Sequence, residues 1–281
     1  MVFSLTYLYL LTPLHTGGAS QEGNLVGIAR ESHTTLPYIP SSTIRGRLRA
    51  NTEPEKRNDL WGNTIEDVTG EGADNLTQGK LWVGDASILW FPVPSLSHGV
   101  VWVTSPLLLK RWARFHANAP TPPPAYSTNL SVESPIYLKD AILKPGSDAD
   151  NLKAWENWDD FVPKHAETSG LDKVLVLPEQ HCTTLIQMSL WRQVKIKLDV
   201  HKSVDGGFRY EEAIPPDTVM YLPWGVTAQA AQSDVAVGKA YAALEDLIQE
   251  HPVVQIGGQE SLGRGFVQQW LSDATSEEEG N

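Results

Sequence analysis

The sequence GGQESLGRGF at residues 257–266 is the stretch that says most about the fold of this chain. Its four glycines are Gly257, Gly258, Gly263 and Gly265. Glycine has no Cβ atom, so such a turn can bring backbone N–H groups close to an anion in a concave nest, and Arg264 would add a bidentate phosphate contact. No Gly-Lys-Ser/Thr and no βαβ unit follow, which excludes a P-loop and a dinucleotide fingerprint. Two interpretations stay open, a phosphate-binding loop and a tight hairpin loop with positive φ angles.

The sequence on both sides of this loop predicts strands that interleave with helices. Val253–Ile256 is an apolar strand that leads into the loop, and Ala228–Gln249 contains apolar residues at helical spacing. Further strands are expected at 3–11, 80–89, 100–104, 183–200 and 218–223, and further helices at 44–51 and 106–115. The order predicts an α+β fold with ferredoxin-like or RRM-like packing, the architecture of RNA-recognition modules.

We expect a single domain over residues 1–281 with two special segments and an acidic tail. A β-hairpin is predicted at about 195–213, with a turn at His201–Gly207 that contains the breakers Asp205-Gly206-Gly207. Residues 116–180 are expected to be an irregular insertion, because a Pro-rich connector is followed by an acidic stretch. Residues 272–281 are expected to be a disordered tail.

The charge of the chain is unevenly spread. The formal net charge is −12, which by itself argues against a nucleic-acid ligand, but a local basic patch is enough for binding. Such a patch is expected between Arg30 and Arg57. There Ser41-Ser42-Thr43 is the predicted N-cap of a helix whose arginines 45 and 49 share one face, while Arg47 points elsewhere. The alternative is that these arginines form an ordinary solvated helix face.

Few residues suggest catalysis, metal binding or export. His15, beside Gly17-Gly18, is a candidate general acid or base or phosphate contact, although a lone histidine after a strand is more often structural. No cluster has convincing metal-ligand spacing, and the one cysteine, Cys182, is expected to be a small buried side chain in a strand. The first basic residue is Arg30, so no signal peptide is predicted, and we expect a cytoplasmic protein with no membrane partner.

Several separate motifs occur in an order that resembles one family. They are TPLHTGG at 12–18, IARESHTTLPYIPSSTIRGRLR at 28–49, LWG at 60–62, GKLWVGDASIL at 79–89, WVTSPLLLKR at 102–111, DGGFRYEEAIPPDTVMY at 205–221 and GGQESLGRGF at 257–266. The chain is similar to the RAMP-superfamily backbone subunits of type III-B (Cmr-type) CRISPR effector complexes. Agreement across seven blocks is a far more specific signal than any one motif.

The resemblance implies a palm that binds guide RNA, and a thumb hairpin that kinks the duplex of guide RNA and target RNA. Implied protein partners are copies of the chain packed head to tail and other type III effector subunits, with no firmly bound cofactor. The implied RNA contacts are His15, Arg30, Ser41, Ser42, Arg45, Arg47, Arg49, Arg209, Gly257, Gly258, Gly263, Arg264 and Gly265.

One departure from the family concerns cleavage of target RNA. The family's cutting aspartate lies five positions before the arginine that matches Arg30, and here that position is Leu25. Leucine cannot bind Mg²⁺, while the neighbouring Asn24 is a weak ligand and a poor base. We therefore expect weak or absent cleavage, with His15 and Asn24 as the catalytic candidates, Glu22 as a less favoured one, and Mg²⁺ needed only if cleavage occurs.

Three alternatives stay open for the function. The chain could be an active metal-dependent endoribonuclease that cuts target RNA. It could be a stand-alone ribonuclease that processes guide RNA with His15 as the general acid or base. It could also be an interaction scaffold that binds no RNA.

Overall fold

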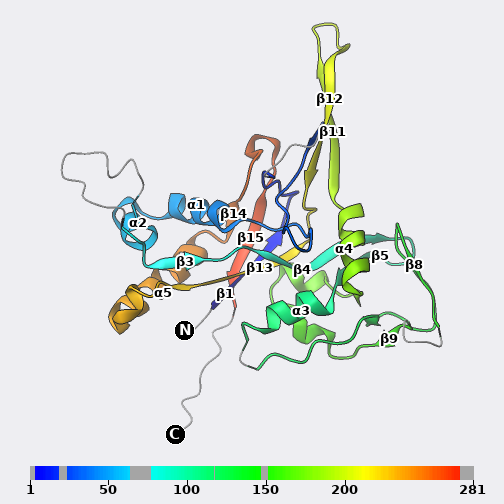
Figure 1. Ribbon diagram of the computed structural model, residues 1–281, viewed down its shortest axis with the longest axis horizontal. Coiled ribbons are helices and arrows are strands. Elements are labelled where there is room, and N and C mark those ends of the chain that lie inside the picture. Colours follow the sequence, from blue (N-terminus) through cyan, green and yellow to red (C-terminus); the bar gives the residue numbers. More distant parts are fainter. Residues whose placement is uncertain (1–3, 19–23, 64–76, 117, 147–150, 273–281) are drawn as a thin grey trace.

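The computed structural model describes residues 4–18, 24–63, 77–116, 118–146 and 151–272 (Figure 1). Five α-helices lie in these ranges: α1 (Ser41–Asn51), α2 (Pro54–Trp61), α3 (Pro106–Ala113), α4 (Glu179–Met188) and α5 (Asp234–Glu250). None of the helices in the described part of the chain is long and apolar enough to cross a membrane.

A ten-stranded mixed sheet forms the body of the protein. In spatial order its strands are β14 (Val253–Gln255), β15 (Phe266–Leu271), β1 (Ser4–Leu10), β13 (Val219–Val226), β4 (Ser87–Ser95), β5 (Gly99–Thr104), β10 (Val174–Val176), β6 (Ser127–Thr128) and β9 (Lys153–Ala154), with β3 (Leu81–Val83) also paired to β13. Neighbours are antiparallel, except that β10 is parallel to β5 and β9 is parallel to β6. The coarse prediction of a mixed fold of sheet and helices is confirmed.

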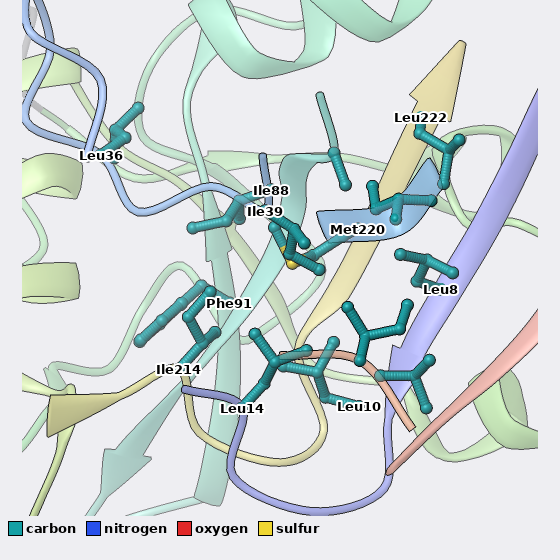
Figure 2. Packing of buried hydrophobic residues seen from close by; sticks show 14 of the residues in the cluster. Leu8, Leu10, Leu14, Leu36, Ile39, Ile88, Phe91, Ile214, Met220 and Leu222 are labelled. Atoms are coloured by element: carbon teal, nitrogen blue, oxygen red, sulfur yellow. The ribbon is translucent and has the colours of Figure 1, made fainter. Parts of the chain in front are cut away.

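Both faces of this sheet are buried. Leu8 and Leu10 of β1 join a cluster with Met220 and Leu222 of β13 (Figure 2), which also contains side chains from α1, α4 and α5. The alternate residues of β1, such as Tyr7, belong to a second cluster that includes part of α3. Side chains alternate across a strand, so a central strand covered on both faces is apolar at nearly every position. This explains the run YLYLL, which shows only partial alternation.

A second, three-stranded sheet carries the predicted hairpin. It consists of β11 (Trp191–Leu198), β12 (Val204–Ala213) and the short β2 (Leu25–Val26), which pairs with β12 in parallel. The hairpin projects beyond the body (Figure 1). The turn predicted at 201–207 is placed too far along the chain, because the predicted breakers at 205–207 lie inside β12 and the observed turn spans 199–203. There Asp199 Oδ1 accepts hydrogen bonds from the backbone N–H groups of His201 and Ser203 at 2.8 and 2.9 Å.

Four local expectations need correction. The predicted strand at 183–200 begins inside helix α4, which starts after Pro178 and buries Cys182 in a helix rather than a strand. The expected N-cap at residues 41–43 is wrong, because α1 already begins at Ser41, directly after Pro40. The strand expected at 80–89 is split into β3 and β4. Helix α2 and strand β15 were not predicted.

The expected insertion at 116–180 takes part in the main sheet. It supplies β6, β9 and β10, as well as a small antiparallel pair of β7 (Ile136–Tyr137) and β8 (Ile142–Leu143). Val174, Leu175 and Val176 have no exposed surface. Whether the segment is an insertion relative to its family stays a prediction. Of the tail expected at 272–281, residues 273–281 lie outside the described residues.

Candidate nucleic-acid interface

Two clefts meet at Gly17, which lines both of them. The first cleft, of about 440 Å³, lies between α1 and the glycine loop at 257–258. The second, of about 710 Å³, continues toward the base of the hairpin and is lined by Leu25, Arg30 and Glu212, among others. Together the clefts form a path from α1 across the residues after β1 to the hairpin.

One face of α1 forms a wall of the first cleft. Its residues Thr43, Gly46, Arg47 and Ala50 are spaced as neighbours on a single helix face. A Cβ atom at Gly46 would meet no atom within 4 Å, so the helix backbone is open to the cleft at this point. Arg47 Nη2 donates to Gln255 Oε1 at 2.6 Å, which holds this half-exposed guanidinium at the cleft wall.

The other two arginines of α1 lie away from this cleft. Arg45 donates to the carbonyl oxygen of Trp61, and Arg49 donates to that of Arg57 at 3.2 Å and to Asn58 Oδ1 at 2.8 Å. The Trp61 carbonyl lies at the end of α2, where helix carbonyls lack intrahelical partners, and Arg49 also donates to the carbonyl oxygen of Gly62 directly after the helix. The prediction that Arg45 and Arg49 share a face is confirmed, and the structure gives that face an internal role as the C-terminal cap of α2.

The glycine loop packs directly on the segment that contains His15. Gly258 N–H donates to the His15 carbonyl at 2.9 Å, and a Cβ atom at Gly257 would lie 2.4 Å from the same oxygen. A Cβ atom at Gly265 would lie 2.0 Å from the carbonyl oxygen of Ile256, and φ is positive at Gly257, Gly263 and Gly265. The interpretation as a tight loop with positive φ angles is therefore confirmed, and an anion contact by Gly257 and Gly258 stays a prediction.

Arg264 points into the protein rather than into the clefts. It is 4% exposed; its Nη2 donates to Gln193 Oε1 at 2.7 Å, and its Nη1 lies 3.4 Å from Glu211 Oε2. It also donates to Gln259 within its own loop. This guanidinium fixes the glycine loop against the hairpin, so the structure does not favour the predicted phosphate contact.

His15 is buried beneath the glycine loop. The Glu212 carbonyl can only accept, so His15 Nδ1, at 2.7 Å from it, carries the proton and donates. The ring thus links the residues after β1 to the base of β12. A structural role explains this geometry, and catalysis by His15 stays a prediction.

Leu25, the position where the resemblance implies an aspartate, lies in the second cleft. β2 pairs Leu25 with Tyr210 of the hairpin, and Leu25 lines the cleft. Asn24 is exposed, and its carbonyl oxygen accepts from Tyr210 N–H at 2.8 Å. Glu22 lies outside the described residues.

The remaining predicted contacts surround the same path. Ser41 and Ser42 stand at the start of α1, where Ser41 N–H donates to Asp85 Oδ1 at 2.6 Å. Arg209 lies on the hairpin beside Glu211. Sequence reasoning missed Gly46, Gln255 and Arg192, whose roles depend on contacts between distant segments. In the described ranges no three His, Cys, Asp or Glu side chains are grouped as metal ligands.

Comparison with known proteins gives consistent matches over nearly the whole chain. The RAMP superfamily matches residues 7–268. The protein described as CRISPR system Cmr endoribonuclease Cmr4 from Pyrococcus furiosus is 31% identical, with 97% of this chain and 96% of that protein covered.

Two solved structures share the fold. The crystal structure of oligomeric Cmr4 from Pyrococcus furiosus is 24% identical, with a TM-score of 0.68 over 97% of this chain and 98% of that one. A subunit of the type III-B Cmr-beta complex bound to cognate target RNA, solved by cryo-electron microscopy, is 20% identical, with a TM-score of 0.70 over the same shares of the two chains.

Proposed function

This chain belongs to the RAMP superfamily and, within it, to the Cmr4 group, and on that premise we propose that it is a repeating backbone subunit of a type III CRISPR ribonucleoprotein. Its ligands are a guide RNA and the target RNA paired to it. The observation that carries the proposal is the path of two clefts joined at Gly17, walled by open glycine backbone and by Arg47 and Arg30. Glycines leave room for a phosphate to approach the cleft walls closely, and the two guanidinium groups supply positive charge.

The core of this subunit corresponds to a ferredoxin-like palm. Four strands support this proposal, because β15, β1, β13 and β4 are adjacent in this order and all their pairings are antiparallel. Helix α1 lies in the connection from β1 to β4, and α5 in the connection from β13 to the β14–β15 pair. This is the order of a split βαβ unit, used by RNA-recognition modules.

The partners follow from the same premise. The relatives include an oligomeric Cmr4 and a Cmr complex with target RNA, so we assign to this chain copies of itself, packed head to tail, and other effector subunits. A reducing cytoplasm suits its single buried thiol.

An alanine at Gly46 tests the RNA path. The methyl group meets no atom of the free protein and removes a helix glycine, so we expect Gly46→Ala to stabilise the chain by about 0.5–1 kcal/mol. The same methyl group occupies the first cleft and should weaken binding of single-stranded RNA. Gly238→Ala in α5 is the matched control, since it also has open space around it but lies on no wall of either cleft. Chemical denaturation and fluorescence anisotropy measure the two effects, and equal RNA affinity of the two variants would contradict the path.

We also propose that the subunit cuts target RNA poorly. Leu25 occupies the cleft position of the family aspartate, and its backbone pairing with Tyr210 fixes this register. Restoring the carboxylate with Leu25→Asp should therefore produce Mg²⁺-dependent, regularly spaced cuts in labelled target RNA by the assembled complex. Leu25→Asn is the control. Efficient cutting by the unchanged protein would favour the endoribonuclease alternative, which is the second candidate because the Pyrococcus furiosus relative is named an endoribonuclease.

A further inference from the structure

Two consecutive carboxylates are buried at the base of the hairpin. Glu211 and Glu212 of β12 are 0% and 1% exposed. Successive side chains of a strand point to opposite faces, so the two carboxylates leave the hairpin in opposite directions. A buried charge is costly unless it is paired, and each of these has its own set of cations.

Glu211 is tied to the glycine loop and to its own hairpin. Its carboxylate lies 2.8 Å from Lys195 Nζ, 3.0 Å from both Nε and Nη2 of Arg209, and 3.4 Å from Nη1 of Arg264. Burial would raise the pKa of Glu211, but the hydrogen bonds and charges of Lys195 and Arg209 outweigh it and hold the pKa below its usual range. The hairpin is thereby held against the glycine loop, whose residues 257–258 line the first cleft.

Glu212 is tied to the second cleft. Its carboxylate lies 2.6 Å from Arg30 Nη2 and 3.0 Å from Arg192 Nε. Arg30 also donates to Gln187 in α4, so this face of the hairpin is fixed to the helix that precedes it. Arg192 is the cross-strand partner of Glu212 and therefore shares its face.

In each set one arginine is still open to solvent. The side chains of Arg209 and Arg192 are 58% and 53% exposed, whereas those of Arg30, Lys195 and Arg264 are 27%, 26% and 4% exposed. Five cations surround two carboxylates, which leaves a formal surplus of positive charge although the chain is acidic. Such a surplus at the rim of a cleft favours an anionic ligand.

We propose that Glu211 and Glu212 are positioning residues that hold Arg209 and Arg192 on opposite faces of the hairpin base, where each arginine contacts one phosphate of an RNA strand that passes the hairpin. The proposal rests on the proposed RNA-binding function and deepens it. One end of each guanidinium is fixed by the buried carboxylate, and the planar fork keeps further N–H groups for a phosphate.

Variants that neutralise the two carboxylates distinguish positioning of the arginines from simple electrostatic attraction of RNA. Glu211→Gln and Glu212→Gln each remove a negative charge next to the RNA path, so attraction alone would make RNA bind more tightly. Loss of arginine positioning would instead weaken RNA binding. We expect each variant of the full chain to bind a single-stranded oligouridine RNA about fivefold or more weakly, the lower end of typical coupling between sites.

The matched control is Asp205→Asn. It removes the same charge from an exposed ion pair with Lys197, 2.9 Å away and farther along the hairpin, and should leave the affinity unchanged or slightly higher. If Glu211→Gln and Glu212→Gln behave like this control, the proposal is overturned.

The arginines are tested by variants that keep their charge. Arg192 and Arg209 are half-exposed, so Arg192→Lys and Arg209→Lys should fold even if a glutamine at a buried site does not. Each lysine variant keeps the charge but loses the planar guanidinium with its several N–H donors, so we expect both variants to bind RNA more weakly. Removal of the charge in Arg192→Gln or Arg209→Gln should lower the slope of log affinity against log salt by about 0.7, the value for one phosphate of a single strand. Unchanged affinity in both lysine variants would overturn the assignment.

A distance measurement makes failure of this proposal distinguishable from failure of RNA binding. Spin labels at Val200→Cys in the hairpin turn and Val235→Cys in α5 occupy exposed sites. The native Cys182 should stay unlabelled, because burial raises its pKa to about 12. We expect a narrow distance distribution that broadens in Glu211→Gln and Glu212→Gln but not in Asp205→Asn. If the unchanged chain binds no RNA, the proposed function fails, whereas an unchanged distribution in the glutamine variants means that the carboxylates do not position the hairpin.

Discussion

At the scale of single residues, the glycines of the 257–266 loop show how one feature serves two purposes. Gly257 and Gly265 are required because a Cβ atom would collide with the carbonyl oxygens of His15 and Ile256. The same closeness leaves the neighbouring Gly258 backbone exposed at a wall of the first cleft. Positive φ angles and open backbone are thus two consequences of packing this loop on the segment after β1.

The Glu211 carboxylate predicts how stability depends on pH. The folded-state pKa is below the value of an unfolded chain, so the carboxylate contributes stability above the ordinary pKa of about 4.3 and loses it as the pH falls through the lowered folded pKa. We expect Glu211→Gln to be less stable than the unchanged chain at pH 7, and the difference to shrink in acid. Urea denaturation at pH 7, 5, 4 and 3 measures it. A difference that grows in acid would contradict the assignment.

At the scale of secondary structure, α1 divides its arginines between two tasks. Arg49 donates to the carbonyl oxygen of Gly62 at the end of α2, whereas Arg47 stands at the first cleft. We expect Arg49→Ala to lower the free energy of unfolding by about 1–3 kcal/mol, because buried carbonyls lose a charged donor, with little loss of RNA affinity per folded molecule. Arg47→Ala should instead weaken RNA binding and leave the free energy of unfolding nearly unchanged. Thermal denaturation and RNA titration of the two variants test this, and the assignment fails if Arg49→Ala binds RNA worse than Arg47→Ala does.

The hairpin is also divided between its two faces. The cross-strand pairs Val194–Tyr210 and Ile196–Phe208 lie on one face, and all four residues are about half-exposed. The pair Lys195–Arg209 lies on the other face. An exposed apolar stripe of this kind is typical of a contact surface, and it fits the thumb that the family resemblance implies.

Sequence periodicity predicted the elements whose pattern is simple. Helix α5 has apolar residues at helical spacing, and β5 is a short apolar run bounded by Gly99 and Pro106. Helix α4 was missed although its buried residues Cys182, Leu185 and Ile186 are at helical spacing, because Thr183 and Thr184 favour strands. Strand β15 was missed because Gln268 and Gln269 interrupt it, although Gln269 is buried and donates to the carbonyl oxygen of His251.

The site was harder to predict than the fold. The motifs pointed to segments that line the two clefts, through Arg30, Arg47, Gly257 and Gly258. What the sequence could not give was the direction of each guanidinium. Arg264 points to Glu211, and Arg45 points to the end of α2, because of partners that only the folded chain brings near.

At the scale of the whole molecule, an acidic protein contains a path with surplus positive charge. The net charge is −12, yet the clefts and the hairpin base gather Arg30, Arg47, Arg192 and Arg209. The exposed acids Glu245 and Asp246 lie on α5, which is on the side of the body away from the hairpin (Figure 1). Local attraction and long-range repulsion therefore act on an approaching RNA with opposite signs.

Because the arginines of the path and the acids of α5 lie apart, we expect local attraction and long-range repulsion of RNA to respond differently to salt. Glu245→Gln with Asp246→Asn removes repulsion that acts only over distance, so we expect faster RNA association at 0.01 M salt, where the Debye length is about 30 Å. At 0.15 M salt, where it is about 8 Å, the gain should vanish, and the dissociation rate should be unchanged at both. Arg47→Ala should instead speed dissociation at both salt concentrations, because its contact is direct. Stopped-flow measurements separate the rates, and a changed dissociation rate in the α5 variant would mean that RNA contacts α5 itself.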